Sequence, residues 1–166
     1  MVKLIITEKP SVATDIAKTL GIKNKKDGYI EGNGYIISWA VGHLVELAKP
    51  ENYDESYKKW DITQLPIIPT QFKLQTKKET YKQYLTLKNL LNSPEVSEVI
   101  CATDAGREGQ LIFGWIYQLS KCKKPVKRLW ISSYTEQAIK KGFDSLKDNK
   151  EYESLFESAQ ARAQAD

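Results

Sequence analysis

Cysteine, histidine and long apolar runs are all scarce in this chain of 166 residues. The two cysteines, Cys101 and Cys122, belong to no Cys-x-x-Cys pair, which argues against a disulfide framework and against a zinc site. The only continuous apolar run near the start, residues 4–6, is too short for a signal peptide. No segment has the length of about 20 apolar residues that spans a membrane. We therefore expect a cytoplasmic protein with no membrane partner.

The composition is that of an ordinary soluble domain, with 41% hydrophobic and 28% charged residues. A net charge of +4 permits a polyanionic partner without requiring one. The basic residues gather in two stretches, which are Lys73, Lys77, Lys78 and Lys82, and Lys121, Lys123, Lys124, Lys127 and Arg128. Either stretch alone is explained by a solvated surface. Together with an acidic site they favour contact with a nucleic-acid backbone.

Apolar periodicity and turn signals predict an α/β fold. Strands are expected over residues 2–6, 98–103 and 128–131, a hairpin over 29–41, and helices over 11–20, 78–91, 108–119 and 135–146. Ser11 and Thr135 are candidate helix N-caps, and Gly21 is a candidate C-cap. Residues 49–72 are rich in proline and aromatics and predict an irregular, ordered excursion. Alternating strands and helices predict a mainly parallel sheet with helices on both faces.

Two of the predicted strands end in acidic residues. Glu8 follows the first strand, and Asp104 and Glu108 follow the strand over 98–103. Ligands bind at the carboxyl ends of strands in such sheets, and carboxylate clusters hold Mg²⁺ for work on phosphates. Helix capping would explain Asp104 or Glu108 alone, but not the matching position of Glu8. Gly106 and Gly109 permit a close backbone approach. Phosphate chemistry at a metal site is the leading hypothesis.

Basic residues lie next to these acids. Lys9 directly follows Glu8 and is a candidate for contact with a phosphate, although a plain surface lysine fits equally well. Arg107 lies between Asp104 and Glu108, where it could neutralise them or touch a phosphate. His43, the single histidine, lies in a loop beside a glycine, where structural and functional roles are both open.

Three further residues are candidates for contact with nucleic acid. Trp60, beside two lysines, could stack on a base or belong to a local core. Arg162 and Asp166 are four residues apart and share one face of a helix, where a simple ion pair is the default interpretation.

Five motifs, in this order, resemble the N-terminal part of bacterial type IA DNA topoisomerases of the topoisomerase III branch. They are TEKPSVA at 7–13, GHLVELAKPENY at 42–53, LPIIP at 65–69, ATDAGREG at 102–109 and KRLWISS at 127–133. The resemblance covers essentially the whole chain. The first and fourth motifs look like a Toprim domain, which implies a Rossmann-like, mainly parallel sheet flanked by helices.

The resemblance implies a role for each matching residue. Glu8 and Lys9 correspond to catalytic residues at the scissile phosphate, and Glu8, Asp104 and Glu108 correspond to ligands of Mg²⁺. The DNA-binding set, from resemblance and chemistry together, is His43, Trp60, Arg107, Arg162 and Asp166. Two positions depart from the family pattern: Gly106 replaces the second aspartate of a D-x-D pair, and Gln110 stands where an acid is common. We expect modest Mg²⁺ affinity without DNA.

The resemblance also implies partners and domain organisation. The expected partner is DNA with single-stranded regions, and no nucleotide cofactor is expected. Residues 1–150 would form the Toprim domain with an insertion at about 28–75, and residues 151–166 would begin the helix leading into a further domain. The family cleaves one strand through a tyrosine in a later domain, and none of the nine tyrosines here matches that motif. We therefore expect a fragment that alone does not relax supercoiled plasmid.

Two other functions stay open. One is a self-sufficient Toprim nuclease or primase-like enzyme, in which Glu8, Asp104 and Glu108 would act without a tyrosine. The other is a non-catalytic DNA-binding module of a mobile element, whose DNA binding would depend on salt but not on Glu8.

Overall fold

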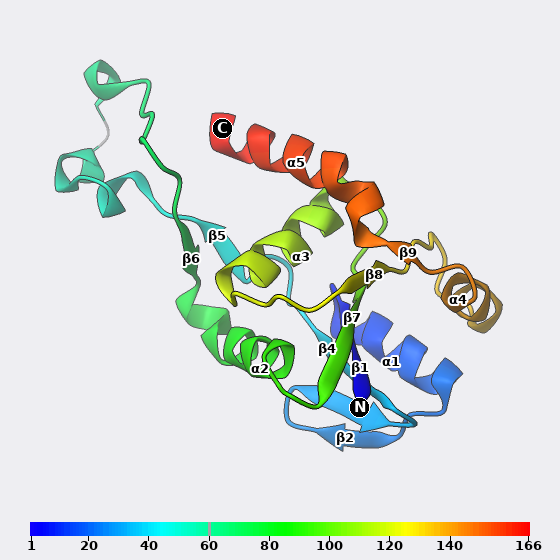
Figure 1. Ribbon diagram of the computed structural model, residues 1–166. Coiled ribbons are helices and arrows are strands. Elements are labelled where there is room, and N and C mark those ends of the chain that lie inside the picture. The colour runs from blue at the N-terminus through cyan, green and yellow to red at the C-terminus, as the bar shows by residue number, and fades with distance from the viewer. Residues whose placement is uncertain (60) are drawn as a thin grey trace.

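A seven-stranded sheet forms the centre of the computed structural model, which describes residues 1–59 and 61–166. The strand order is β2-β3-β4-β1-β7-β8-β9 (Figure 1). The four inner strands are parallel: β1 (Val2–Thr7), β4 (Tyr35–Trp39), β7 (Val96–Ala102) and β8 (Val126–Arg128). The edges are antiparallel: β2 (Asn24–Lys26), β3 (Tyr29–Gly32) and β9 (Lys147–Asp148). The predicted mainly parallel α/β fold is confirmed.

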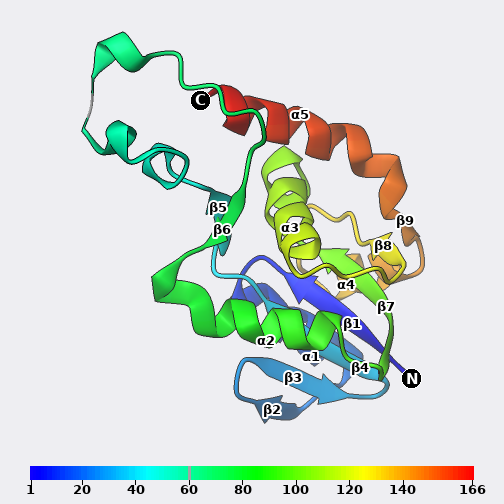
Figure 2. The same ribbon diagram turned by 60° about the vertical axis from the view of Figure 1, so that its left-hand side comes forward.

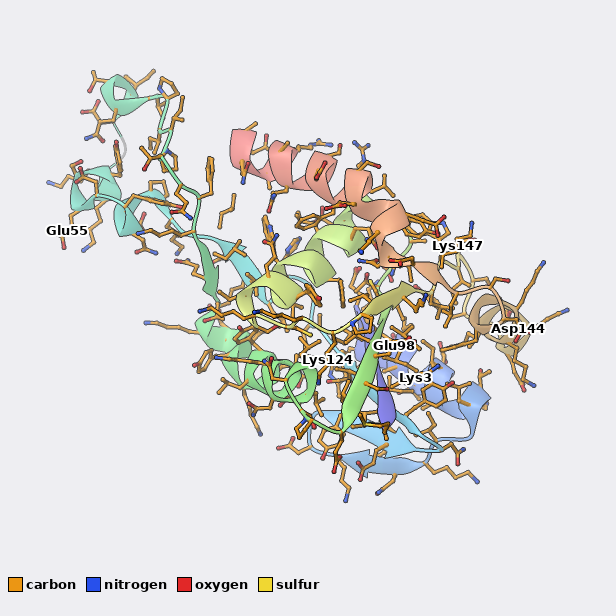
Figure 3. The ribbon with its side chains drawn as sticks, viewed as in Figure 1. Lys3, Glu55, Glu98, Lys124, Asp144 and Lys147 are labelled. Atoms are coloured by element: carbon orange, nitrogen blue, oxygen red, sulfur yellow. The ribbon has the colours of Figure 1, made fainter. Side chains whose placement is uncertain are left out.

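Strand β1 lies in the middle of the parallel part of the sheet. Its apolar residues Leu4, Ile5 and Ile6 are fully buried, because helices cover both faces and leave no face for polar side chains. An ion pair between Lys3 Nζ and Glu98 Oε1, at 3.8 Å, joins β1 to β7 at the entry end of the strands (Figure 3). At the other end Thr7 pairs with Ala102, so the segments after β1 and β7 emerge side by side.

Helices cover the sheet on both faces, as predicted. Helices α1 (Pro10–Leu20) and α4 (Glu136–Phe143) pack on one face, around a core that includes Ile16 and Ile139. Helices α2 (Tyr81–Leu91) and α3 (Arg107–Leu119) cover the other face, and α5 (Glu153–Ala165) lies along α3 (Figures 1 and 2). Short 3₁₀ turns precede α2 and α5, at Lys78–Thr80 and Asn149–Tyr152.

The predicted N-cap of the first helix was wrong by two residues. Helix α1 begins at Pro10, and Lys9 occupies the N-cap position without a side-chain cap, so Ser11 is inside the helix. Proline favours the first helical position because its fixed φ suits the helix and its missing N–H has no partner there. The C-cap prediction is confirmed, since Gly21 adopts the left-handed conformation with φ 70°.

The last predicted strand and helix differ in length from the structure. The strand expected over 128–131 is β8, which runs over Val126–Arg128 instead. Beyond its end, Trp130 stacks on Tyr152 with ring centroids 4.7 Å apart. Thr135 caps α4 as predicted, its Oγ1 accepting a hydrogen bond from the Ala138 N–H at 3.2 Å. That helix ends at Phe143 rather than at 146, and the chain returns to the sheet as β9.

Residues 48–59 and 61–73 leave the main body as an extension. It starts from a separate two-stranded sheet of β5 (Val45–Leu47) and β6 (Leu74–Thr76) and carries 3₁₀ turns at Pro50–Asn52, Glu55–Lys58 and Ile62–Gln64. Figures 1 and 2 show it projecting beyond the sheet, and Figure 3 labels Glu55 on it. The candidate Trp60 lies outside the described residues. Within the described part, no helix is long and apolar enough to cross a membrane.

Candidate functional site

Glu8 and Asp104 meet where β1 and β7 end. The backbone N–H of Asp104 donates a hydrogen bond to Glu8 Oε1 at 3.3 Å, joining residues 96 apart in the sequence. Burial raises the pKa of Glu8, and the negative charge of Asp104 raises it further. Ionising Glu8 therefore costs free energy in the folded chain, and a nearby cation would recover part of that cost.

Lys9 faces the same two acids from the segment after β1. Its Nζ lies 3.8 Å from Asp104 Oδ2, and the Thr7 hydroxyl donates to the Lys9 carbonyl at 2.9 Å, which shapes this turn. The Lys9 side chain is 59% exposed, so the ion pair contributes little to stability. The ammonium group is therefore only weakly held in this position.

The loop between β7 and α3 is tight at one of its two glycines. A Cβ on Gly109 would lie 1.9 Å from the carbonyl oxygen of Asp104, so only glycine fits there. The Thr103 hydroxyl closes the turn by donating to the Gly109 carbonyl at 2.8 Å. At Gly106, by contrast, nothing lies within 4 Å of the corresponding Cβ position. The close approach predicted for this loop is thus confirmed at Gly109, and Gly106 leaves open space.

Arg128 holds the loop between β7 and α3 through hydrogen bonds, and this role was not predicted. Its side chain is fully buried, and Nη2 donates to the Asp104 carbonyl at 2.9 Å. Nη1 donates to the Cys101 carbonyl and to Thr103 Oγ1, both at 3.1 Å, and the guanidinium lies 5.0 Å from the centre of the Trp130 ring. The sequence placed Arg128 in a basic surface stretch. The sequence signal for its position was the spacing of two residues between Arg128 and Trp130, which in a strand places both side chains on the same face of the sheet.

Tyr134 is the second residue that the sequence did not single out. Its hydroxyl donates a hydrogen bond to Asp104 Oδ1 at 2.9 Å. Burial, followed by the hydrogen bond to Asp104 and the charge of Asp104, raises the pKa of Tyr134 far above its usual value, so the hydroxyl keeps its proton and acts as a donor. A tyrosine between a strand and a helix carries no sequence signal for such a contact.

Glu108 faces a different neighbour from the other two predicted metal ligands. Its Oε1 shares a hydrogen bond with Nε2 of His43. The ring centroids of His43 and Trp115 lie 5.9 Å apart. Among residues 1–59 and 61–166, no group of three His, Cys, Asp or Glu side chains is arranged to hold a metal ion. Gln110 is buried and donates to Asn149 Oδ1 at 3.2 Å, so its amide is engaged inside the protein.

A cleft of about 640 Å³ runs beside the acidic loop, between β5, α3 and α5. It brings together four of the predicted DNA-binding residues: His43, Arg107, Arg162 and Asp166. Lys77 and Glu46 add further charges, and Trp115 forms part of the wall. The indole N–H of Trp115 donates to Gln160 Oε1 at 3.0 Å and so ties α3 to α5. Residues from four distant parts of the sequence thus share one polar cleft.

Known proteins with similar sequences and structures agree on one family. The Toprim domain family matches residues 3–134. DNA topoisomerase 3 of Shouchella clausii is 55% identical over 99% of this chain, and DNA topoisomerase 3 of Bacillus cereus is 53% identical over 98%. The chain spans 22% of the length of each relative.

A solved structure gives the same fold. Full-length topoisomerase I from Thermotoga maritima superposes with a TM-score of 0.55 at 22% identity, over 87% of this chain and 21% of that one. At this level of identity the likeness concerns the fold alone. Because the family match covers most of the chain, and because the high identity to topoisomerase 3 extends over nearly all of it, this protein belongs to the Toprim domain family and resembles the Toprim part of DNA topoisomerase 3.

Proposed function

We propose that this chain is the Mg²⁺-binding and DNA-contacting part of a type IA, topoisomerase 3-like enzyme that breaks and rejoins one strand of DNA. The observation that carries the proposal is the meeting of Glu8 and Asp104 at two strand ends, with Lys9 beside them. In this site Lys9 contacts the scissile phosphate, and Glu8 acts next to it in cleavage and religation. The similarity to DNA topoisomerase 3 supports this assignment.

The donor set fits Mg²⁺. This ion prefers oxygen ligands and is commonly bound through one or two carboxylates together with substrate phosphates and water. Glu8 and Asp104 would supply the carboxylates, and burial, followed by the charge of Asp104, raises the pKa of Glu8. Bound Mg²⁺ would neutralise the charge that builds up on the phosphate. Glu108 as a third ligand remains a prediction, since its carboxylate is paired with His43.

The cleft supports binding of a single DNA strand. Arg107, Arg162 and Lys77 provide positive charge along it, and the ring of Trp115 lies in its wall. Single-stranded DNA is bound by such grooves, where cations follow the backbone and aromatic rings take bases. The strand-cleaving tyrosine implied by the resemblance has no counterpart among the nine tyrosines of this chain, so the chain alone is proposed to be inactive in relaxation.

Replacing Glu8 with glutamine is expected to weaken Mg²⁺ binding by on the order of tenfold or more. A unit charge about 4 Å away contributes about 1–4 kcal/mol in water or near a protein surface, and every 1.4 kcal/mol is tenfold in affinity. Isothermal titration calorimetry of the 166-residue chain, with Mn²⁺ as a second probe, would measure the change.

Glu136→Gln is the matched control for this measurement, because Glu136 lies on α4 and pairs with Lys140 at 2.9 Å. Its cation affinity should equal that of the unchanged chain. Equal affinity for the Glu8→Gln chain would contradict the proposed metal site. The same titration of Glu108→Gln decides whether the third predicted ligand contributes.

Replacing Arg162 with alanine is expected to weaken binding of a single-stranded oligonucleotide. It should also reduce the salt dependence of binding. Each phosphate contact on a single strand adds about 0.7 to the magnitude of the slope of log affinity against log salt concentration, so loss of one contact should make the slope shallower by about 0.7. Fluorescence anisotropy over a salt series measures both. Lys147→Ala, on edge strand β9 outside the cleft, is the control and should leave the slope unchanged.

The two rival functions make different predictions. A self-sufficient nuclease would nick DNA as the isolated chain with Mg²⁺, and Glu8→Gln would abolish that nicking. A non-catalytic module would bind DNA in a salt-dependent manner that neither Mg²⁺ nor Glu8→Gln alters. The pairing of Glu8 with Asp104 favours metal chemistry over the second of these.

A further inference from the structure

One motif of the sequence, KRLWISS at 127–133, contributes Arg128 and Trp130 to the support of the acidic loop. It leads from β8 into Tyr134, whose hydroxyl contacts Asp104. We propose that Tyr134 is a positioning residue that occupies one oxygen of the Asp104 carboxylate, so that Asp104 offers a cation a single oxygen and the site favours Mg²⁺ over Ca²⁺. The part concerning cation choice rests on the proposed metal site, whereas the positioning of Asp104 does not.

All four polar atoms of Asp104 have different neighbours. Its N–H donates to Glu8 Oε1 at 3.3 Å, and its carbonyl accepts from Arg128 Nη2 at 2.9 Å. In the carboxylate, Oδ1 accepts from the Tyr134 hydroxyl at 2.9 Å, and Oδ2 lies 3.8 Å from Lys9 Nζ. The main chain and the side chain of Asp104 are therefore both fixed before any ligand arrives.

The two carboxylate oxygens differ in how readily their neighbours can be displaced. Tyr134 is half-buried and packs against the core that α1 and α4 cover, so its hydroxyl has no easy alternative position. Lys9 is largely exposed and is held only by a long ion pair. An incoming cation can therefore displace Lys9 from Oδ2 at little cost, but it cannot displace Tyr134 from Oδ1 without leaving a polar group unsatisfied.

Arg128 makes this arrangement rigid. Its guanidinium holds the carbonyls of Cys101 and Asp104 and the hydroxyl of Thr103, while Trp130 packs over it. The end of β8 thus supports the backbone of the acidic loop through Arg128, and the segment between β8 and α4 holds the Asp104 carboxylate through Tyr134. A carboxylate fixed in this way cannot rotate freely to offer both oxygens to one ion.

The restriction to one oxygen affects Mg²⁺ and Ca²⁺ differently. Mg²⁺ binds six ligands in near-octahedral geometry and takes carboxylates through single oxygens, whereas Ca²⁺ takes six to eight ligands and accepts both oxygens of one carboxylate. Removing the Tyr134 hydroxyl frees Oδ1 and lets the carboxylate turn. Mg²⁺ should lose affinity because its ligand is no longer oriented, while Ca²⁺ gains a possible second contact.

Tyr134→Phe and Tyr117→Phe form a matched pair for the test. The Tyr117 hydroxyl also donates a hydrogen bond of 2.9 Å, but to the carbonyl of Lys124 on the far side of α3, and both tyrosines are partly buried. Each variant loses one hydroxyl and one hydrogen bond, so their melting temperatures should fall alike. Only Tyr134→Phe should change the surroundings of the Asp104 carboxylate.

The first measurement is the ¹³C carboxyl resonance of Asp104 in the metal-free chain, identified by its absence in Asp104→Asn. We expect it to shift in Tyr134→Phe and to stay unchanged in Tyr117→Phe. The second is calorimetric titration with Mg²⁺ and with Ca²⁺. We expect Tyr134→Phe to lower Mg²⁺ affinity by roughly tenfold, as loss of a partner of a metal ligand commonly does, and to leave Ca²⁺ affinity equal or higher.

An unshifted Asp104 resonance in Tyr134→Phe would overturn the positioning role. An equal loss of Mg²⁺ and Ca²⁺ affinity would overturn the claim on cation choice. If the unchanged chain binds neither cation, the proposed metal site and the claim on cation choice both fail, and the resonance still decides the positioning role because that measurement needs no metal.

Discussion

Replacing Gly109 with alanine is expected to lower the free energy of unfolding by about 3 kcal/mol, the upper range for forcing an extra methyl group into a packed site. The new Cβ would meet the Asp104 carbonyl oxygen at 1.9 Å and the Asp104 backbone nitrogen at 3.1 Å. The backbone cannot move aside easily, because Arg128 holds that same carbonyl. Urea unfolding followed by circular dichroism measures the loss as a lower midpoint.

Gly114→Ala is the control for this change, since it makes the same substitution in the same helix. There the nearest atoms belong to the side chain of Phe156, with the closest at 2.3 Å, and a side chain can rotate away. Both changes gain about 1 kcal/mol of helix propensity. Gly114→Ala should therefore cost clearly less, and a Gly109→Ala midpoint at or above that of Gly114→Ala would show that the loop is not tight.

Replacing Arg128 with lysine is expected to cost about 3 kcal/mol although the charge is kept. A lysine ammonium is a single point and cannot reach the Cys101 carbonyl, Thr103 Oγ1 and the Asp104 carbonyl together, as the planar guanidinium does. Leaving a buried polar group without a partner costs about 1–3 kcal/mol. The loss should appear as a lower urea midpoint, together with weaker Mg²⁺ binding.

Lys127→Arg provides the comparison, because Lys127 precedes Arg128 on β8 but is not fully buried. A change at a site of this kind usually stays within about 0.5 kcal/mol. If Arg128→Lys were equally mild, the hydrogen bonds of the guanidinium to the acidic loop would contribute little to stability, and the loop would have to be held by its other contacts.

The strand ends and most helices could be predicted from the sequence because they follow from local patterns. The apolar run of residues 4–6 identifies a strand buried on both faces, and this placed Glu8 just beyond its carboxyl end. Gly21 and Thr135 predicted a helix end and a helix start, because capping depends only on residues a few positions apart. The approach of Glu8 to Asp104 followed from the general geometry of parallel sheets.

The supports of the site could not be predicted because they depend on long-range packing. Arg128 looked like one more basic residue of a surface stretch, yet it is fully buried. Nothing in the sequence distinguishes Tyr134 from the other tyrosines, since its contact with Asp104 spans 30 residues. Strands of two or three residues, such as β5 and β9, are too short to show a period. The pairing of Glu108 with His43 likewise depends on how α3 faces β5.

Because β1 lies between β4 and β7, the two halves of this site form at different times during synthesis of the chain. Ribosomes add about 5–20 residues per second, and the contact between Glu8 and Asp104 spans 96 residues, so Glu8 emerges roughly 5 to 20 s before Asp104. In that interval β1 can already pair with β4, to which helix α1 connects it. The other edge of β1, which later pairs with β7, is still unpaired. Glu8 is thus placed first, and its contact with Asp104 forms only once the second half of the chain has closed the sheet.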